Sequence, residues 1–388
     1  MMTSQERHEA RYQRRKTSRE QKRRNRSNAI GGVAEVFSFN AMFRAGKTCC
    51  NGVRWKNSTQ RFELHLFSGT AARRKQLLDG TWQPSPYSHF AINERGKTRI
   101  IDAPKIQDRQ IHKVYTKRVL LPLYQPQMIY NNGASMRGKG LHFSQELVKR
   151  YLHSHFRQYG LAGKIILLDF HAFFPSASHE IIRNRHRAFI HNEALRRIGN
   201  MIVDSTAGDG LPLGVETSQV EMVAYPSSLD NHLQSQLSLG KSGHYMDDYI
   251  ITVPPPADAE MVLESVCNKA NKLGLSINTA KTRIISFGKS FRYCKARYLI
   301  TAKGGVRVTC NKDSVPRDRR KLKAFHRLLA EGKMKMSDVS CAVNAVFAYL
   351  DRFNNHRSVL KLRRLFYALF EARSDNQNTR VSGATGKE

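Results

Sequence analysis

The sequence lacks the features that mark membrane proteins, disulfide-rich proteins and thiolate metal sites. None of its apolar runs approaches the roughly 18 residues that a membrane-spanning helix needs. We therefore expect no contact with a membrane. Its six cysteines form no CxxC pair and no metal-ligand spacing, so we expect free thiols in a reducing cytoplasm. The charged N-terminus has no apolar stretch behind it, and we expect no secretory signal there.

Acidic residues are scarce relative to basic ones. The 388 residues include 65 Lys and Arg against 31 Asp and Glu, a formal net charge of +34. This excess favours a nucleic-acid partner, because each phosphate contact releases condensed counterions. A solubilising basic surface is the alternative. The hydrophobic content of 40% is ordinary for a globular protein, and the length allows more than one core.

The two ends of the chain differ from the region between them. Residues 1–30 are basic and polar without a firm apolar face, and we expect a disordered arm that orders on nucleic acid. Residues 373–388 read as a polar tail. Between them, "SHFAINERGKTRIIDAP" predicts two strands joined by a polar turn at Glu94 to Lys97.

Three carboxylates stand at the ends of predicted strands. In "GHYMDDYIITV", Asp247 and Asp248 lie at a tight hairpin between two strand-forming runs, and in "GKIILLDFHAFFPS" an apolar strand ends at Asp169. If these strands are neighbours in one sheet, the acids converge and repel unless divalent cations lie among them. Mg²⁺ prefers carboxylate oxygens together with substrate phosphates. The pattern therefore favours a two-metal site for phosphoryl transfer.

A plainer interpretation of the acidic pair stays open. Two adjacent aspartates are also typical of an exposed turn, and sequence spacing alone does not bring Asp169 to the hairpin. The basic charge and the further motifs of the chain decide between the two interpretations.

Several motifs together resemble the reverse transcriptases. "LLDFHAFFPS" at 167–176, "GLPLGVETSQ" at 210–219 and "YMDD" at 245–248 look like conserved blocks of that family, in order and at suitable separations. "GKTRIIDAPKIQDRQIHK", "NNGASMRGKG" and "LGLSINTAKT" extend the resemblance, which covers about residues 40–370.

The resemblance implies an α+β fold, the right-hand polymerase fold. Its fingers, with the first palm elements, would occupy residues 31–160, and its palm, an antiparallel sheet with helices, residues 161–290. The primer grip and a helical thumb would occupy residues 291–372.

The resemblance also implies the catalytic centre. Asp169, Asp247 and Asp248 would be metal ligands, with Phe170 beside them as a further metal- and substrate-binding position. Two Mg²⁺ ions would bind there, with Mn²⁺ as a substitute. Lys281 matches a lysine that acts as proton donor to pyrophosphate, although a surface lysine would look the same.

The nucleotide site follows from the same blocks. Lys97 and Arg99 would bind the triphosphate, unless they belong to a solvated hairpin. Phe174 would block a ribose 2′-hydroxyl and select deoxynucleotides, and the neighbouring Phe173 could fill that role instead. The remaining nucleotide-binding positions are Gly214, Ser218, Gln219, Tyr245 and Met246.

Nucleic-acid contacts are expected in a basic loop, in the primer grip and on a thumb helix. In "RDRRKLKAFHRLL", Leu322, Phe325 and Leu329 would pack inward and leave the cations outside. The predicted contacts are Arg137, Lys139, Tyr293, Lys295, Arg319, Arg320, Lys323 and Arg327.

Departures from the common motifs narrow the lineage. Leu213-Gly214 and Ser218-Gln219 resemble diversity-generating retroelement and defence-associated bacterial enzymes, and "FRYCKARY" replaces the common primer-grip motif. No RNase H, integrase or endonuclease-like region fits in the remaining length.

These features predict a cytoplasmic RNA-templated DNA polymerase from a bacterium or its phage. It would make cDNA from dNTPs on a dedicated non-coding RNA, in antiphage defence or, alternatively, in error-prone diversity generation. Template-independent or protein-primed synthesis, a non-catalytic RNA-binding role, an accessory protein and a homo-oligomer stay open.

Overall fold

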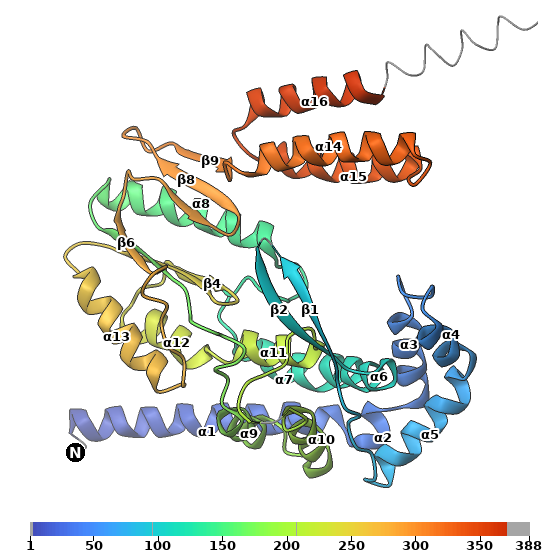
Figure 1. Ribbon diagram of the computed structural model, residues 1–388. Helices are drawn as coiled ribbons and strands as arrows, with labels where there is room; N and C mark the ends of the chain where they lie inside the picture. Colours follow the sequence, from blue (N-terminus) through green and yellow to red (C-terminus); the bar gives the residue numbers. More distant parts are fainter. Residues whose placement is uncertain (1–2, 95, 207, 371–388) are drawn as a thin grey trace, which may run out of the picture. The chain divides into compact units, whose positions relative to one another are not determined.

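The computed structural model (Figure 1) describes residues 3–94, 96–206 and 208–370. The chain divides into two compact units. The first contains the chain up to Ser144, Ile166–Val253 and Asp258–Ile284, and the second contains Gln145–Ile165, Pro254–Ala257 and the chain from Ile285 on. The predicted polar tail, residues 373–388, lies outside the described residues.

The expectation of a disordered arm at residues 1–30 is wrong for the part that the structure describes. Ser4–Ile30 form one long helix, α1. A capping box starts it: Thr3 Oγ1 accepts from Glu6 N, and Glu6 Oε2 accepts from Thr3 N. Arg, Lys, Gln and Glu, which dominate the segment, are good helix formers even without an apolar face.

Polar groups help to anchor the end of α1, together with Ile30, which packs against a hydrophobic core. Ser27 is buried and its Oγ accepts a hydrogen bond from His191 N at 2.8 Å. The Arg23 guanidinium lies 4.5 Å from the centre of the Phe189 ring. The earlier turns of α1 are mostly exposed.

Short helices and one hairpin form the rest of the N-terminal part of the first unit. The hairpin pairs β1 (Ser88–Glu94) with β2 (Lys97–Ala103) in antiparallel register from Ser88↔Ala103 to Glu94↔Lys97, as predicted. The helices are α2 (Val33–Val36), α3 (Phe39–Cys49), α4 (Asn57–Leu64), α5 (Leu66–Leu78), α6 (Ile106–Tyr115) and α7 (Leu121–Tyr124), with a π-helical segment at Thr116–Leu120 and a 3-10 turn at Gln125–Gln127.

A mixed layer of sheet and helices follows in the same unit. The four-stranded sheet has the order β4-β5-β3-β6, made of β3 (Lys164–Leu168), β4 (Ser242–Tyr245), β5 (Asp248–Val253) and β6 (Arg283–Ser286). Its helices are α9 (His179–Phe189), α10 (Glu193–Val203), α11 (Glu216–Ala224), α12 (Ser227–Asn231), continued by a π-helical segment at His232–Gln236, and α13 (Ala259–Asn271).

One hydrophobic core joins the sheet to these helices. Ile166 and Leu168 of β3 pack with Ile251 of β5 and with Val262 and Val266 of α13. β3 and β5 are apolar along nearly their whole length because both contribute to this core. The sheet is therefore a rigid support for the polar residues that stand at its strand ends.

The second unit combines a small sheet with helices. α8 (Leu141–Tyr159) packs on the antiparallel strands β7 (Phe291–Tyr293), β8 (Ala296–Ile300) and β9 (Val306–Cys310), and Gln145 Nε2 donates to Cys294 O at 2.8 Å. Three helices follow, α14 (Ser314–Ala330), α15 (Met336–Leu350) and α16 (His356–Phe370). The helices and antiparallel strands confirm the predicted α+β class.

Two further sequence expectations can be compared with the structure. All six cysteines lie within the described residues and none is paired in a disulfide. Among the helices that the structure describes, none has the length and apolar character that crossing a bilayer requires.

Candidate active site

The acidic pair lies at the tip of the β4–β5 hairpin. Tyr245 pairs with Asp248, so Met246 and Asp247 form a two-residue turn. Met246 has φ +57°, a left-handed conformation that costs free energy in a residue other than glycine. The tight turn presents Asp247 at its tip and starts β5 with Asp248.

Asp169 joins this pair because β3 and β5 are neighbours in the sheet. It directly follows β3 and is 7% exposed. Burial raises the pKa of Asp248 to about 6, with further contributions from the negative charges of Asp247 and then Asp169. Burial also raises the pKa of Asp247, and Asp169 adds to that effect. Asp247 and Asp248 therefore share one electrostatic environment with Asp169, whose negative charge disfavours their ionisation.

Two side chains from a distant segment hold the Asp169 carboxylate. Lys281 Nζ lies 2.5 Å from Asp169 Oδ2, and Asn278 Nδ2 donates to the same oxygen at 3.2 Å. The main chain pairs there too, since Asn278 N donates to Asp169 O at 2.8 Å. The sequence predicted Lys281 as a site residue and missed Asn278, whose signal would have been its position three residues before Lys281 in the motif.

The β1–β2 hairpin brings a second cation towards the acids. The positive charge of Arg99 lowers the pKa of Asp247, as that of Lys281 does, so both cations lie within electrostatic range of the turn. Lys97 is the first residue of β2, and the structure does not describe its side chain. Of the two predicted triphosphate-binding cations, Arg99 is the one that the structure relates to the acids.

A loop before α11 packs on β2. Asp102 N donates to Leu213 O at 3.2 Å, and Gly214 has φ +99°. A Cβ at Gly214 would lie 3.0 Å from Ile101 Cγ2, so both the conformation and the close approach favour glycine. In the first turn of α11, Ser218 is buried and Gln219 is exposed.

The aromatic residues after Asp169 divide between core and surface. Phe170 is 3% exposed and stacks on Phe173, with ring centroids 5.6 Å apart. The Phe170 ring is thus a core residue, so a metal or substrate contact at this predicted position would come from its main chain. Phe173 is also buried, whereas Phe174 is half-buried, as are Tyr245 and Met246 of the turn.

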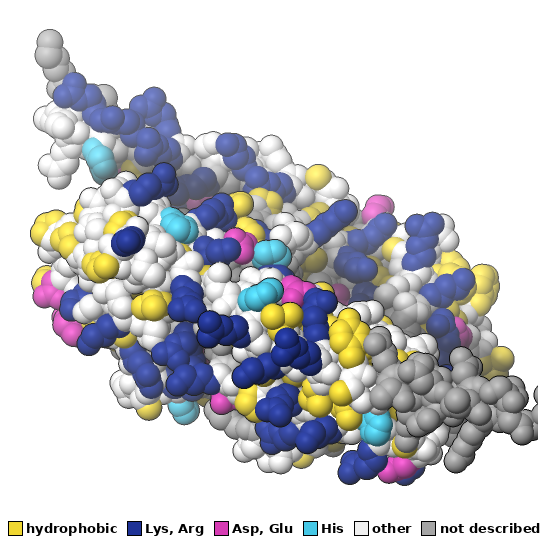
Figure 2. All heavy atoms as spheres, turned by 90° about the horizontal axis from the view of Figure 1, so that it is seen from above, with side chains coloured by type: hydrophobic (Ala, Val, Ile, Leu, Met, Phe, Trp, Pro, Cys, Tyr) yellow, Lys and Arg dark blue, Asp and Glu magenta, His cyan; other side chains and the backbone are white. Residues whose placement is uncertain are grey.

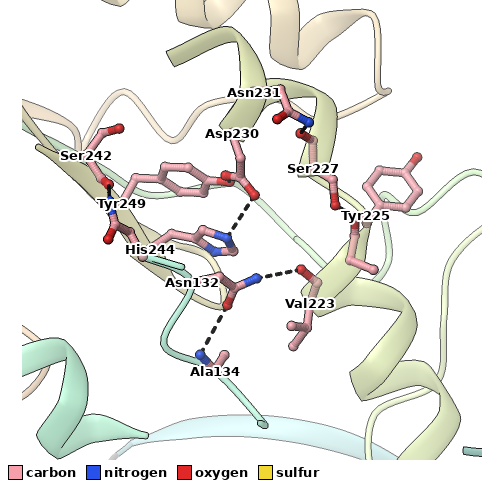
Figure 3. A network of polar contacts seen from close by, with 12 residues as sticks. Asn132, Ala134, Val223, Tyr225, Ser227, Asp230, Asn231, Ser242, His244 and Tyr249 are labelled. Atoms are coloured by element: carbon pink, nitrogen blue, oxygen red, sulfur yellow. Dashed lines mark hydrogen bonds and ion pairs between the residues drawn. The ribbon is translucent and has the colours of Figure 1, made fainter. Parts of the chain in front are cut away.

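Sequence reasoning missed a buried polar network beneath the turn (Figure 3). His244 Nδ1 donates to the carbonyl of Met246 at 3.0 Å, and its Nε2 lies 3.3 Å from Asp230 Oδ2. Tyr249 donates its hydroxyl hydrogen to Asp230 Oδ1 at 2.8 Å and stacks on the His244 ring. These three side chains are almost fully buried and tie the strained turn to α12.

The same network continues into the glycine-rich loop before α8. Asn132 is fully buried, donates to Val223 O at 3.0 Å and pairs with His244 as an isolated parallel bridge (Figure 3). Gly133 N donates to His244 O at 2.9 Å. The apolar residues that flank Asp230 and His244 in the sequence would have indicated that both side chains are buried. Nothing in either segment indicates that the two residues meet.

Lys139 closes this loop and is not free for nucleic acid. Its ammonium donates to the carbonyls of Tyr130 and Asn132 at 2.7 and 3.0 Å and lies 5.2 Å from the centre of the Phe143 ring. Burial lowers its pKa. These contacts argue against its predicted role, whereas Arg137 in the same loop is exposed.

In the second unit, the residues that were predicted to contact nucleic acid differ in how exposed they are. Tyr293 is 7% exposed, which argues against a contact between its ring and nucleic acid. Lys295 is exposed in a two-residue turn with Cys294, both at positive φ. On α14, Leu322 is buried and the four predicted cations, Arg319, Arg320, Lys323 and Arg327, are exposed. On the face drawn in Figure 2, Lys and Arg side chains are many and acidic ones few.

The acids suit hard divalent cations by their chemistry but are not arranged as a finished site. Carboxylate oxygens are ligands that Mg²⁺ prefers, and the pKa values of Asp247 and Asp248 are raised by burial first and by the neighbouring carboxylates in addition. Among the described residues, no three His, Cys, Asp or Glu side chains are grouped closely enough to hold a metal ion. A cation at Asp169 would have to displace the Lys281 ammonium from Oδ2.

Comparison with known proteins gives a family match. The family model for reverse transcriptase (RNA-dependent DNA polymerase) matches residues 89–312. No curated protein sequence matches the chain significantly.

Solved structures similar to the chain include two telomerases. One is Candida albicans telomerase in complex with a TWJ fragment of telomeric RNA, with 13% identity and a TM-score of 0.44 over 73% of this chain and 55% of that one. The other is apo telomerase from Candida tropicalis, with 11% identity and a TM-score of 0.45 over 60% and 49%. The matched region thus spans about half the length of these telomerase chains.

Proposed function

The chain belongs to the reverse transcriptase (RNA-dependent DNA polymerase) family, and we propose that it copies a dedicated structured RNA into DNA in the cytoplasm of a bacterium. The matched region is an RNA-directed DNA polymerase, a nucleotidyltransferase. Enzymes of this family generally use divalent metals. Template RNA, dNTPs and the cDNA product are the partners that this proposal implies.

The observation that carries the proposal is the placement of the acids: Asp169 directly follows β3, and Asp247 and Asp248 stand at the turn that starts the neighbouring strand β5. These three carboxylates, with the main chain at Phe170, would hold two Mg²⁺ ions or, as a substitute, Mn²⁺. When bound, the ions would activate the primer hydroxyl and offset the charge of the triphosphate.

The chain's own side chains supply positioning, selectivity and a proton. Arg99, which acts electrostatically on Asp247, would orient the triphosphate. Phe174 would limit space at the sugar, because it is half-buried whereas its neighbour Phe173 is buried. Lys281 would donate a proton to the leaving pyrophosphate from its place beside Asp169. Gly214, Gln219 and the turn residues would line the nucleotide and template path.

The biological role that we favour is antiphage defence. The support is the basic N-terminal segment, which forms α1, and the unusual "FRYCKARY" hairpin. Diversity-generating retroelements are the second candidate, favoured by Leu213-Gly214 and Ser218-Gln219 before and within α11. A template/variable repeat pair and a small helical accessory protein gene beside this gene would favour the second role.

The decisive experiment is incorporation of dNTPs on primed RNA with Mg²⁺. We expect synthesis by the wild-type protein and none by Asp247→Ala, with RNA binding retained in both. Incorporation by Asp247→Ala at the wild-type rate would remove this residue from the metal site. A wild-type protein that is inactive on every template, including its co-purifying RNA, would favour a non-catalytic RNA-binding protein.

Two controls separate the remaining alternatives. Synthesis that persists after the template is omitted would indicate template-independent polymerisation. A DNA product that migrates with the protein in a denaturing gel, and is released by protease digestion, would indicate protein priming. Sequencing the RNA that co-purifies with the active protein would identify the template.

A further inference from the structure

The two-residue turn between β7 and β8 is built from residues that disfavour its conformation. Tyr293 pairs with Ala296, which leaves Cys294 and Lys295 as the turn. Cys294 has φ +47° and Lys295 has φ +62°, and hairpin turns of this kind usually contain Asn-Gly. A left-handed conformation costs free energy in residues with a Cβ, so contacts outside the turn have to stabilise it.

A buried glutamine of α8 holds the first carbonyl of the turn. Gln145 Nε2 donates to Cys294 O at 2.8 Å, and both residues are buried. Water therefore does not compete for this hydrogen bond. A bond in such a shielded place is stronger than the same bond in water, and removing it would cost the turn a contact that solvent does not replace.

A tyrosine of α15 holds the second carbonyl of the turn. Tyr349 Oη donates to Lys295 O at 3.3 Å. Burial raises the pKa of the Tyr349 hydroxyl, and a side-chain hydrogen bond with Gln145 opposes this shift, so the hydroxyl keeps the proton that it donates. The Tyr349 ring also meets buried Phe353 edge to face, with ring centroids 5.0 Å apart. This packing fixes the direction of the hydroxyl.

The end of α15 is tied to both Gln145 and the small sheet. Arg352, which lies two residues after α15, donates from Nη2 to Gln145 Oε1 at 3.3 Å. Asn354 exchanges two hydrogen bonds with Val308 of β9: its main-chain N donates to Val308 O at 2.7 Å, and its Oδ1 accepts from Val308 N at 2.9 Å. The end of α15 therefore keeps a fixed position relative to the turn.

The turn presents one exposed cation. Lys295 is exposed, whereas Tyr293 and Cys294 before it and Ala296 after it are buried. Asn-Gly at the two turn positions would connect the strands with less strain and without the help of two helices. A local rule that is broken with such support is expected where function requires the residue, which here is the ammonium of Lys295.

We propose that Gln145, Tyr349 and Arg352 are positioning residues, which fix the turn so that Lys295 meets the backbone of the primer strand. The inference rests on the proposed function, in which this hairpin is the predicted primer grip. None of the three side chains needs to touch the primer, because each acts through a carbonyl of the turn or through Gln145. No local pattern indicates them, since Gln145 and Tyr349 lie 149 and 54 positions from the residues that they hold.

Steady-state kinetics of two variants of the full-length protein test the proposal. Gln145→Leu removes the amide at similar size, and Tyr349→Phe removes only a hydroxyl. In single-nucleotide incorporation, the KM for the primer–template duplex should rise roughly tenfold for Gln145→Leu and roughly threefold for Tyr349→Phe, the range expected for one or two hydrogen bonds. The KM for dNTP should not change, because the nucleotide binds at the catalytic acids. A folding defect alone would lower kcat without separating the two KM values.

A second substitution separates positioning from a general structural effect. Cys294→Gly allows the left-handed conformation without strain and keeps Lys295, so in combination with Gln145→Leu it should restore most of the lost duplex affinity. Absence of this rescue would show that Gln145 does not act through the turn and would overturn the proposal. The matched controls are Gln158→Leu, at an exposed position of α8, and Tyr367→Phe, at an exposed position of α16, and both should leave the two KM values unchanged.

Two further readouts do not require synthesis. Trypsin cleaves after lysine, and limited digestion followed by mass spectrometry should show faster cleavage after Lys295 in both variants than in the wild type. Fluorescence anisotropy with a DNA–RNA duplex and no dNTPs should show the same loss of affinity as the KM values. Unchanged cleavage together with unchanged affinity would overturn the proposal, whereas a wild type that binds the duplex but incorporates no dNTP would contradict the proposed function alone.

Discussion

Lys281 Nζ lies 2.5 Å from Asp169 Oδ2, although the two residues are 112 positions apart in the chain. This ion pair places a positive charge among three carboxylates that would otherwise repel one another. The same ammonium lowers the pKa of both Asp247 and Asp248, against the larger effect of burial. Lys281 therefore influences all three acids at once.

Replacing Lys281 should shift the pH dependence of synthesis. In Lys281→Gln the pKa of Asp247 and Asp248 rises further, so both acids hold their protons to a higher pH. The acidic limb of the pH–rate profile should move to higher pH, and kcat should fall about a hundredfold if the ammonium is also a proton donor. Single-nucleotide incorporation over a pH series measures both effects. Lys272→Gln is the control, and an unmoved acidic limb would refute this account.

Asp248 should lower the stability of the metal-free protein at neutral and alkaline pH. Its pKa is about 6 in the folded protein against an ordinary value of 3.8, so the protonated form is favoured by folding. Its stabilising contribution is present below pH 3.8 and is lost as the pH rises through about 6. At pH 8 the ionised carboxylate costs at most about 3 kcal/mol.

Urea unfolding in EDTA measures this cost. Asp248→Asn should exceed the wild type in free energy of unfolding at pH 8 but not at pH 4, and Mg²⁺ should reduce the difference by stabilising the ionised wild type. Asp79→Asn, at an exposed helix end, is the control. An equal gain at both pH values would show that ionisation is not the cause.

Removing one hydroxyl should weaken the support of the hairpin turn. Tyr249→Phe deletes the hydrogen bond to Asp230 and should lower the free energy of unfolding by about 1 to 3 kcal/mol. If the network positions the turn, kcat should fall while the KM for dNTP changes little. Tyr298→Phe is a matched control, because the buried Tyr298 hydroxyl has no hydrogen-bond partner among the residues described. If Tyr249→Phe and Tyr298→Phe changed kcat equally, the network would not be what positions the turn for catalysis.

Phe174 should govern sugar selectivity. Phe174→Ala opens the half-buried position and should raise ribonucleotide use relative to deoxynucleotide use by roughly tenfold or more. Phe173→Ala should leave the selectivity unchanged and instead destabilise the core by about 3 to 5 kcal/mol. The measurement is the ratio of kcat/KM values for a matched pair of nucleotides. A change in that ratio for Phe173→Ala alone would assign the gate to the other ring.

The exposed turns of α1 should contribute electrostatic affinity for RNA. Deleting residues 1–20 removes several cations and leaves Arg23 and Ser27, which anchor the helix. RNA affinity should fall, and the slope of log K against log salt should decrease by about 0.7 to 0.9 for each phosphate that the deletion leaves unneutralised. Fluorescence anisotropy at several salt concentrations measures the slope. A full-length variant with the same cations replaced by glutamine should behave alike, and an unchanged slope would mean that α1 does not contact RNA.

Much of the fold was predictable because local patterns are strong. Alternating and apolar runs predicted the β1–β2 hairpin, β3 and the β4–β5 hairpin, and the amphipathic pattern of α14 placed Leu322 inside. The prediction for α1 failed because Ser27, Arg23 and the single apolar residue Ile30 anchor it, and these do not form an apolar stripe. Lys139 was predicted to contact nucleic acid. Its hydrogen bonds to two main-chain carbonyls form only in the folded loop, so the sequence does not show them.

By itself the sequence predicted a nucleic-acid partner, through its charge, and indicated the family, through ordered motifs that end strands with acids. Only the tertiary structure decided that Lys281 pairs with Asp169 beside the turn, and that Asp230 and His244 support this turn from below. The physical reason is distance along the chain. Propensity and periodicity act over a few residues, whereas burial and Coulomb interactions act between groups that only packing brings together.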